Sequence, residues 1–180
     1  MLRGEKVLLR PLKRSDITNF LKWFNEPEVT QYLNFYLPMT EMAEEKWIED
    51  AASRTQAGTG VYFVIEAIEG DSTKPIGSMG LGGINPKDHG ASFGITIGEK
   101  DYWGNGYGTE ATRLILEYGF QQLNLHRISS SAFAFNERSI RLHKKVGFKE
   151  EGRQREAIFK NGRFHDLVYF GILRDEWRGR

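Results

Sequence analysis

The residues best suited to chemistry lie in the loop 103–109, WGNGYGT. Gly104, Gly106 and Gly108 fall within five residues, and without side chains they let a ligand approach the main chain closely. The chain from Thr109 to Gln122 is expected to form a helix, whose first amide groups lack intrahelical acceptors. Unpaired amides and the helix dipole together form an anion site, and a diphosphate is a common ligand of such sites.

The glycine spacing excludes two familiar phosphate motifs. A P-loop needs a lysine before its Ser or Thr, whereas Gly108 precedes Thr109 here. The dinucleotide fingerprint reads G-x-G-x-x-G, which differs from the G-x-G-x-G of this loop. A tight strand-to-helix connection would explain the glycines equally well, so the loop alone does not establish a phosphate site.

A second polar group is expected on a helix of residues 136–146. At 100° per residue, Asn136, Ser139 and His143 lie within about 60° of one another, beside an apolar stripe. These side chains can donate and accept hydrogen bonds toward a ligand. Asn136 is also a favourable N-cap and His143 could be an ordinary surface residue, so both interpretations stay open.

The elements that position these groups follow from periodicity. Residues 91–98 alternate with Phe93, Ile95 and Ile97 on one side, which predicts a strand that leads into the glycine loop. Asn161-Gly162 predicts a type I′ hairpin near the C-terminus. Further strands are expected at 6–12, 61–68, 76–84 and 126–133, and helices after Ser15, from Pro27 and from Thr40 to about Thr55. We expect one α+β domain over residues 1–180, with a mixed, mostly antiparallel central sheet flanked by helices.

Composition restricts the classes of function. Lys+Arg 25 against Asp+Glu 24 leaves a net charge of +1, which gives no general attraction to nucleic acid or to membranes. We found no targeting signal and no apolar run long enough to span a bilayer, so a cytoplasmic location is expected. The chain has no cysteine, which excludes a thiol nucleophile. His126 and His165 lack metal-ligand spacing, so no metal site is expected.

Two segments carry a family resemblance: YWGNGYGTEA (102–111) and FNERSIRLHKKVGF (135–148). In this order and spacing they resemble the GNAT superfamily of N-acetyltransferases, in particular its RimJ/RimL-like branch of ribosomal-protein N-terminal acetyltransferases. The segments LRPLKRSD (9–16), WFNEPEV (23–29) and EGRQREAIFKNGRFHDLVYFGIL (151–173) fit the same branch, so the resemblance covers essentially the whole chain. It implies a GNAT-like fold and acetyl-CoA as the co-substrate.

The resemblance also implies which residues bind acetyl-CoA. The loop amides would hold its diphosphate, and the backbone near Ile95 and Ile97 would pair with its pantetheine arm. Trp103 stands where the family commonly has Arg or Gln. The cofactor-binding residues implied are Ile95, Ile97, Trp103, Gly104, Asn105, Gly106, Tyr107, Gly108, Thr109, Asn136 and Ser139.

Candidate catalytic residues are His143, Asn136 and Ile97. His143 occupies the position where the family commonly has a tyrosine general acid, and we expect it to protonate the leaving thiolate. The main-chain amide near Ile97 is expected to stabilise the oxyanion. For the base, Ser92 stands where some relatives carry Glu, and the other candidates are Glu66, Asp88, His89 and Glu110. We expect deprotonation through water rather than by a dedicated carboxylate.

The expected function is therefore an acetyl-CoA-dependent N-acetyltransferase in which a primary amine attacks the thioester directly. The acceptor would be a protein N-terminal α-amine or a small amine, with Tyr32 and Tyr36 lining its pocket. An aminoglycoside or polyamine acceptor is the alternative, and acidic residues lining the pocket would favour it. Glu41, Glu44, Glu45, Glu49 and Asp50 suggest such an acceptor, although a solvated helix face explains them equally well. A non-catalytic acyl-CoA-sensing module is the alternative from another class, and a homodimer is left open.

Overall fold

The structure is a computed structural model that describes residues 1–177 and 179. Its strands form one sheet in the order β1-β2-β3-β4-β5-β6-β8-β7. The strands are β1 (Leu2–Arg3), β2 (Val7–Pro11), β3 (Gly60–Glu69), β4 (Ser72–Asn85), β5 (Gly90–Ile97), β6 (Arg127–Phe133), β7 (Lys149–Lys160) and β8 (Arg163–Leu173). The α-helices are α1 (Ile17–Phe24), α2 (Pro27–Thr30), α3 (Glu41–Gln56), α4 (Tyr107–Gln121) and α5 (Glu137–Lys145).

The strand pairing is antiparallel except between β5 and β6, so the mixed, mostly antiparallel sheet predicted from the sequence is confirmed. The parallel pairing is short, because only residues Gly90 to Ser92 pair with Arg127 to Ser129. Beyond this point β5 and β6 diverge, and the sheet opens at its centre.

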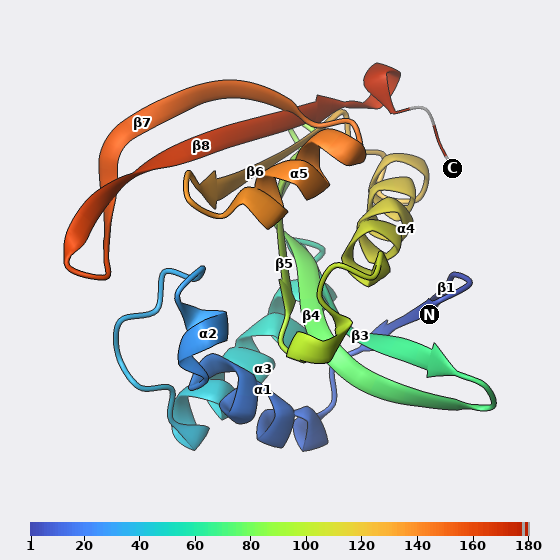
Figure 1. The fold of residues 1–180 in the computed structure, drawn as a ribbon. Helices are drawn as coiled ribbons and strands as arrows, with labels where there is room; N and C mark the ends of the chain where they lie inside the picture. The colour runs from blue at the N-terminus through green and yellow to red at the C-terminus, as the bar shows by residue number, and fades with distance from the viewer. Residues whose placement is uncertain (178, 180) are drawn as a thin grey trace.

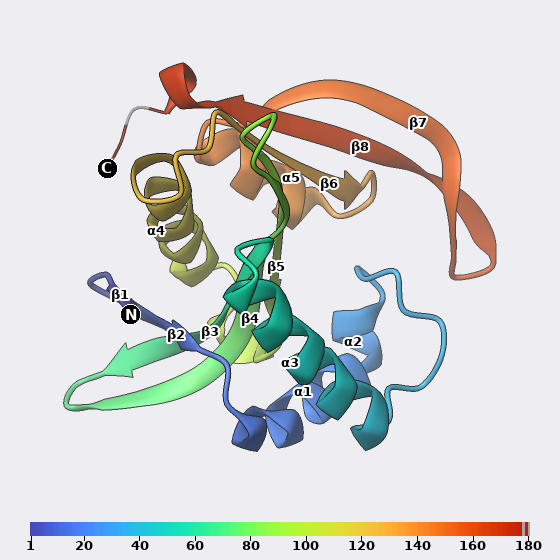
Figure 2. The same ribbon diagram turned by 180° about the vertical axis from the view of Figure 1, so that it is seen from behind.

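The two faces of the sheet carry different helices (Figures 1 and 2). Helices α1 to α3 lie on one face and α4 and α5 on the other. Neighbouring residues of β3 show the alternation: Tyr62 contacts Trp47 of α3 at 5.8 Å, and Phe63 contacts Tyr118 of α4 at 6.0 Å between ring centroids. The main hydrophobic core lies under α4, and a smaller one lies under α1 around Phe20, Trp23 and Val64.

The face of β4 and β5 that is turned toward α3 is built from small residues. Strand register places Gly80 opposite Gly94 and Gly82 opposite Ser92 on the same face as Tyr62. A Cβ atom at Gly80 would come within 2.6 Å of the Tyr62 ring. The Tyr62 ring therefore lies over Gly80, whereas a Cβ atom at Gly94 would meet nothing within 4 Å, so the sheet surface is open to a ligand at Gly94.

The last two strands form a long hairpin that arches over the rest of the molecule (Figure 1). Its two-residue turn has φ 52° at Asn161 and φ 78° at Gly162, which confirms the predicted type I′ turn. The Lys160 ammonium next to this turn donates to the Phe35 carbonyl, so the hairpin tip contacts the loop between α2 and α3.

The predicted caps of the first and third helices have different outcomes. Thr40 caps α3 by accepting from the Ala43 amide at 3.3 Å, as expected. Ser15 does not cap α1, because it lies inside a 3₁₀ turn, Arg14–Asp16. Asp16 is held there by the Lys13 amide and by Arg10. Within the described residues, no helix is long and apolar enough to cross a membrane.

Candidate active site

The glycine loop ends in a helix that begins earlier than the sequence predicted. α4 starts at Tyr107 rather than Thr109, because Gly106 takes a left-handed conformation (φ 89°) and serves as the N-cap residue. The first intrahelical bond runs from the Glu110 amide to the Gly106 carbonyl at 3.0 Å. The amides of Tyr107, Gly108 and Thr109 therefore lie in the first turn without intrahelical acceptors, as an anion site requires.

Side chains from distant parts of the chain hold this loop in place. The Trp103 indole donates to the Ile97 carbonyl at 2.7 Å, and Lys6 Nζ donates to the Asn105 carbonyl at 3.3 Å. Glu110 accepts the main-chain N–H groups of Glu5 and Lys6, so its role is structural. Lys6 also brings a positive charge to the anion site, which no local motif indicated.

The opening between β5 and β6 exposes part of the β5 main chain. Gly98 is paired with Ile76, since its amide donates to the Ile76 carbonyl at 2.8 Å. The alternation of an antiparallel ladder therefore turns the main-chain groups of Ile95 and Ile97 away from β4, toward the opening. The Ile97 carbonyl is bound by Trp103, which leaves the Ile97 amide and both main-chain groups of Ile95 facing the gap.

One cavity of about 1220 Å³ joins the loop, the opening and the face under α3. It reaches both sides of the sheet, because Gly108 and His143 line one end and Trp47 and Tyr62 the other. The predicted residues that line it are Tyr32, Ile95, Ile97, Trp103, Gly104, Gly106, Gly108, Thr109, Asn136, Ser139 and His143. A cavity of this length and volume, with an amide-lined end, fits an extended ligand that carries a diphosphate.

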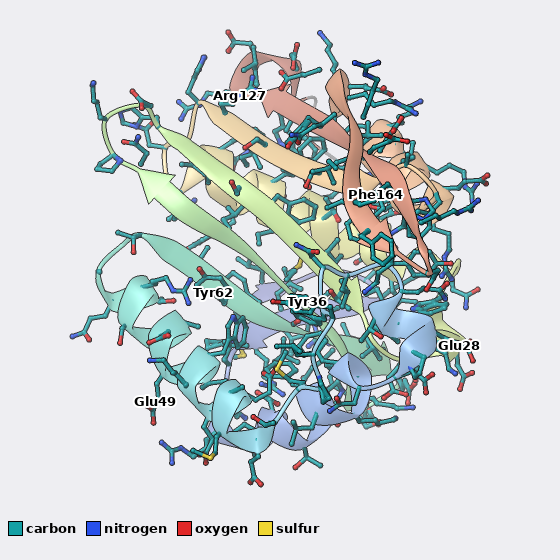
Figure 3. All side chains as sticks on the ribbon, turned by 90° about the vertical axis from the view of Figure 1, so that its left-hand side faces the viewer. Glu28, Tyr36, Glu49, Tyr62, Arg127 and Phe164 are labelled. Atoms are coloured by element: carbon teal, nitrogen blue, oxygen red, sulfur yellow. The ribbon has the colours of Figure 1, made fainter. Side chains whose placement is uncertain are left out.

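Three predicted residues are not among those that line the cavity. Asn105 donates its side-chain amide to the Asp101 carbonyl, and the Tyr107 ring packs on Tyr102 at 5.2 Å. Both can offer a ligand only their main chain. Tyr36 is 87% exposed, so its predicted place in the acceptor pocket is not supported (Figure 3). The extended loop turns Phe35 inward instead, with its ring 5.3 Å from that of Phe24.

The polar face of α5 is directed at the opening. Asn136 caps the helix by accepting from the Ser139 amide at 3.1 Å. His143 Nδ1 lies 2.7 Å from the Ser139 carbonyl, and its Nε2 lies 2.8 Å from Ser130 Oγ. A carbonyl only accepts, so Nδ1 carries the proton and Nε2 of the neutral ring is an acceptor. The Ser130 hydroxyl has one proton to donate, and both Nε2 and the Phe93 carbonyl, 3.0 Å away, lie within its reach.

His143 is buried in an aromatic enclosure, with 2% of its surface exposed. Its ring stacks on Phe170 at 4.6 Å and contacts Phe148 at 5.1 Å. Burial lowers the pKa of His143, and the Ser139 carbonyl only partly opposes this. The ring is therefore neutral near pH 7. Its N–H points at Ser139, so His143 reaches the cavity through the half-buried Ser130 hydroxyl rather than by a proton of its own.

The end of the cavity under α3 contains a carboxylate for which the sequence left two interpretations open, an acceptor pocket and a solvated helix face. Glu44 is 2% exposed and lines the cavity. Its Oε2 atom is buried and has no hydrogen-bond partner among the described residues. A signal was present in the sequence: Glu44, Trp47, Ile48 and Ala51 follow i, i+3, i+4, i+7 spacing and therefore share the apolar face of α3. Glu49 lies on the other side of the helix and is directed outward (Figure 3).

The other candidate bases lie elsewhere. Glu66 accepts from Arg10 Nε at 2.6 Å and from Thr73 at 2.7 Å, inside a buried ion cluster. Asp88 accepts from Asn85 in a turn, and Glu110 binds the main chain of the β1–β2 loop. Glu66, Asp88, His89 and Glu110 are all absent from the cavity lining in the described part of the chain, whereas Ser92 lines it.

Replacing Glu44 with glutamine should stabilise the protein at high pH. Burial raises the pKa of Glu44 from 4.5 to about 7, so between these values the folded state binds more protons than the unfolded state. The wild type therefore loses stability as pH rises through this window, and the variant does not. We expect the difference in unfolding free energy to grow toward about 1–3 kcal/mol at pH 8. Urea titrations at pH 5 and pH 8 measure it, with exposed Glu41→Gln as the control, and equal differences at both pH values would show that Glu44 is paired.

Arg138 is a further residue of the cavity that the sequence analysis did not select. Its guanidinium lies 3.8 Å from the centroid of the Trp103 ring and 5.2 Å from that of Tyr32. It therefore bridges the glycine loop and the α2 region across the cavity, through cation–π contacts. Together with Arg141 and Lys145 it makes the α5 wall of the cavity basic.

The amide-lined loop, the basic wall and the exposed strand edge lie in one cavity, and they match the shape and charge of an acyl-CoA. Comparisons with known proteins agree. Residues 6–149 match the acetyltransferase (GNAT) domain family. The chain is 30% identical over 181 residues to the spermidine N(1)-acetyltransferase of Escherichia coli (strain K12), covering 98% of this chain and 91% of that one.

Solved structures give the same result. The spermidine N-acetyltransferase from Vibrio cholerae in complex with CoA and spermine has a TM-score of 0.84 and 26% identity, over 96% of this chain and 98% of that one. RimJ of Mycobacterium smegmatis in complex with CoA-disulfide has a TM-score of 0.81 over 94% and 83%, and at 21% identity it shows the likeness of fold. The chain belongs to the GNAT acetyltransferase family. It is an acetyl-CoA-dependent enzyme that acetylates amines.

Proposed function

We propose that the acceptor is a compound with a single cationic amine, either the N-terminal α-amine of a protein or a small monoamine. The observation that carries this proposal is the charge of the cavity. Glu44 is the only acidic residue among the described residues that line it, whereas Arg138, Arg141 and Lys145 are basic. Acidic lining residues in excess would be needed to bind several ammonium groups, and the other carboxylates of α3 are not part of the lining.

Deprotonation chemistry also supports an α-amine. A lysine-like amine with a pKa of about 10.4 is neutral only once in a few thousand molecules at pH 7, whereas an α-amine near 8 is neutral roughly a tenth of the time. Among the described lining residues, the candidates for a general base are His143 and Glu44. Both ring nitrogens of His143 already have hydrogen-bond partners, so only Glu44 has an unpaired atom to accept a proton. An acceptor that needs little help to lose its proton fits such a site best.

The chain's own groups then have distinct roles in the transfer. The first-turn amides of α4 bind the diphosphate of the co-substrate, and the main chain at Ile95 orients its arm. The Ile97 amide faces the opening and is placed to donate to the carbonyl oxygen as it becomes negative, a contact typically worth about 3 kcal/mol. The amine nitrogen bonds to the acetyl carbon and the carbon–sulfur bond breaks, with no acetyl-cysteine because the chain has no cysteine.

His143 and Ser130 are proposed to deliver the proton that the sulfur takes up. The attacking amine releases one proton, and Nε2 of the neutral ring can take it up. The protonated ring then donates from Nε2 to Ser130 Oγ, and the Ser130 hydroxyl passes its own proton to the sulfur. The gain is modest, because a thiol with a pKa of about 8.5 already leaves well as a thiolate.

His143→Phe should therefore lower kcat by about tenfold or more and leave the CoA Kd within about twofold. Phenylalanine fits the aromatic enclosure, so the fold should be kept. Ser130→Ala should cause a similar loss, and the double variant should be no worse than either single one. Steady-state kinetics and calorimetry with CoA measure these effects, and an unchanged kcat in His143→Phe would refute the role.

A polyamine is the second candidate acceptor, because the relatives named above act on spermidine or bind spermine. Acetyl-CoA turnover with a panel of N-terminal peptides, monoamines, spermidine and an aminoglycoside distinguishes the two, with free thiol as the readout. We expect kcat/KM to be highest for a peptide or a monoamine, and a preference for spermidine would contradict the proposal. Homodimer formation stays a prediction, which light scattering can check.

A further inference from the structure

The end of the cavity under α3 combines one unpaired carboxylate with aromatic walls. Glu44 and Trp47 lie one turn apart on α3, and Trp47 meets Tyr62 edge-on at 5.8 Å. Phe24 and Phe35, which contact each other at 5.3 Å, also line the cavity. Phe20 connects Phe24 to Trp47, with its ring centroid 5.8 Å from the first and 5.7 Å from the second. Aromatic faces attract cations, and a carboxylate among them gives the cation a partner of opposite charge.

Glu44 is buried without a hydrogen-bond partner, which indicates that a ligand pairs with it. A buried carboxylate without a hydrogen bond is strongly unfavourable, and proteins normally pair such groups. Glu44 takes part in none of the ion pairs seen among the described residues, although two exposed carboxylates of α3, Glu49 and Asp50, do. The exposed carboxylates of the same helix already give it a surface charge without the desolvation cost of burial. The buried position of Glu44 therefore needs a separate explanation.

We propose that Glu44 binds the ammonium group of the acceptor, and that the acceptor is a primary ammonium carried on an apolar or aromatic body. This inference rests on the proposed function and names the chemistry that this end of the cavity recognises. The carboxylate supplies the charge partner, and the rings of Trp47, Tyr62 and Phe24 cover the apolar part of the molecule. Gly94 of β5, where an added Cβ would meet nothing within 4 Å, leaves room for it next to the sheet opening.

The electrostatics of the empty and occupied states agree with this assignment. Burial raises the pKa of Glu44 to about 7, so in the empty cavity the carboxyl is close to half protonated at neutral pH. A cation bound beside it favours the ionised form and lowers the pKa again. Binding of an ammonium therefore favours the ionised carboxylate. It also supplies the partner of opposite charge that the buried group lacks in the empty cavity.

Calorimetric titration of the CoA-loaded protein at pH 8 tests the proposal with two probes, 2-phenylethylamine and 2-phenylethanol. The two molecules have the same ring and chain length, and only the amine carries a charge. We expect the amine to bind the wild type at least tenfold more tightly than the alcohol. Glu44→Gln should weaken the amine at least tenfold, leave the alcohol unchanged and leave the CoA Kd unchanged.

The matched control is Glu41→Gln, which removes the same charge from an exposed position of the same helix and should bind both probes like the wild type. Equal binding of amine and alcohol by the wild type, no binding of the amine, or full amine affinity in Glu44→Gln would each overturn the proposal. A purely structural role is separable, because it predicts a less stable variant, whereas loss of an unpaired buried charge predicts one that is as stable or more so. Failure of the proposed function gives a different result: the protein transfers no acetyl group to any amine of the panel, although it still binds the amine.

Discussion

Replacing Gly106 with valine should weaken CoA binding by about 10- to 100-fold. Gly106 is the N-cap of α4 at φ 89°, a conformation that a β-branched residue almost never adopts. Relief of this strain must turn the peptide units on either side, which moves the amides at the start of the helix. Each charge-assisted contact from an amide to a phosphate contributes about 1.5–3 kcal/mol, so losing one gives the expected change in the Kd. Calorimetry with CoA measures it.

Gly70 provides the matched control. It also has a positive φ, 62°, in the turn between β3 and β4, and an added Cβ there would meet nothing within 4 Å. A Cβ at Gly106 would come no closer than 4.0 Å to Lys6 Nζ, so both valine variants act through the backbone alone. Gly70→Val should lose stability to a similar extent and keep full CoA affinity. If both variants, or neither, lost affinity, the loop would not be the anion site.

Replacing Arg10 with methionine should destabilise the fold by about 3–5 kcal/mol. Arg10 binds Asp16 at 2.7 Å and Glu66 at 2.6 Å, and at most 10% of any of these side chains is exposed. The two carboxylates raise the pKa of Arg10, which therefore stays charged. Removing it leaves two buried carboxylates without their partner. The cluster joins β2 and β3 to the turn before α1, so the acceptor side of the site should loosen first. Urea unfolding measures the loss.

The exposed pair Arg14–Glu49 gives the comparison. Its side chains are 72% and 65% exposed, so Arg14→Met should change the unfolding free energy by less than about 1 kcal/mol. A triple variant, Arg10→Met with Asp16→Leu and Glu66→Leu, should recover much of the loss, because no unpaired charge remains. Equal effects of Arg10→Met and Arg14→Met would mean that the buried cluster contributes no more than a surface pair.

Local sequence features predicted the elements that carry the co-substrate site. The alternation around Phe93 indicated β5, the glycine density indicated the turn, and Asn161-Gly162 indicated the last hairpin. The start of α4 was misplaced by two residues, because the predicted helix began only after the last glycine of the loop, whereas in the structure Gly108 is already helical and the left-handed Gly106 is the N-cap residue. The sequence does not distinguish these two starting points, because glycine permits a left-handed conformation but does not require it.

Residues whose roles depend on tertiary contacts were harder to predict. Glu44 is one acidic residue in an acidic helix, and although its spacing from Trp47 and Ala51 places it on the apolar face, its lack of a hydrogen-bond partner shows only in the structure. Tyr36 and Phe35 are adjacent aromatics in a loop, and the sequence does not indicate which of them turns inward. The position of His143 was predicted, but the direction of its N–H bond depends on the Ser139 carbonyl, and its link to the cavity depends on Ser130 from another strand. Lys6 reaches the glycine loop from the other end of the chain.

The central claim is that main-chain amides at the start of α4 bind the diphosphate of CoA, and its most direct test is a comparison of CoA with pantetheine, which lacks that group. Calorimetric titration of the wild-type protein with each compound gives the two dissociation constants. We predict one CoA site per chain, with pantetheine bound at least about 100-fold more weakly, since two or more amide contacts are lost. Equal affinities, or no heat on addition of CoA, would contradict the account.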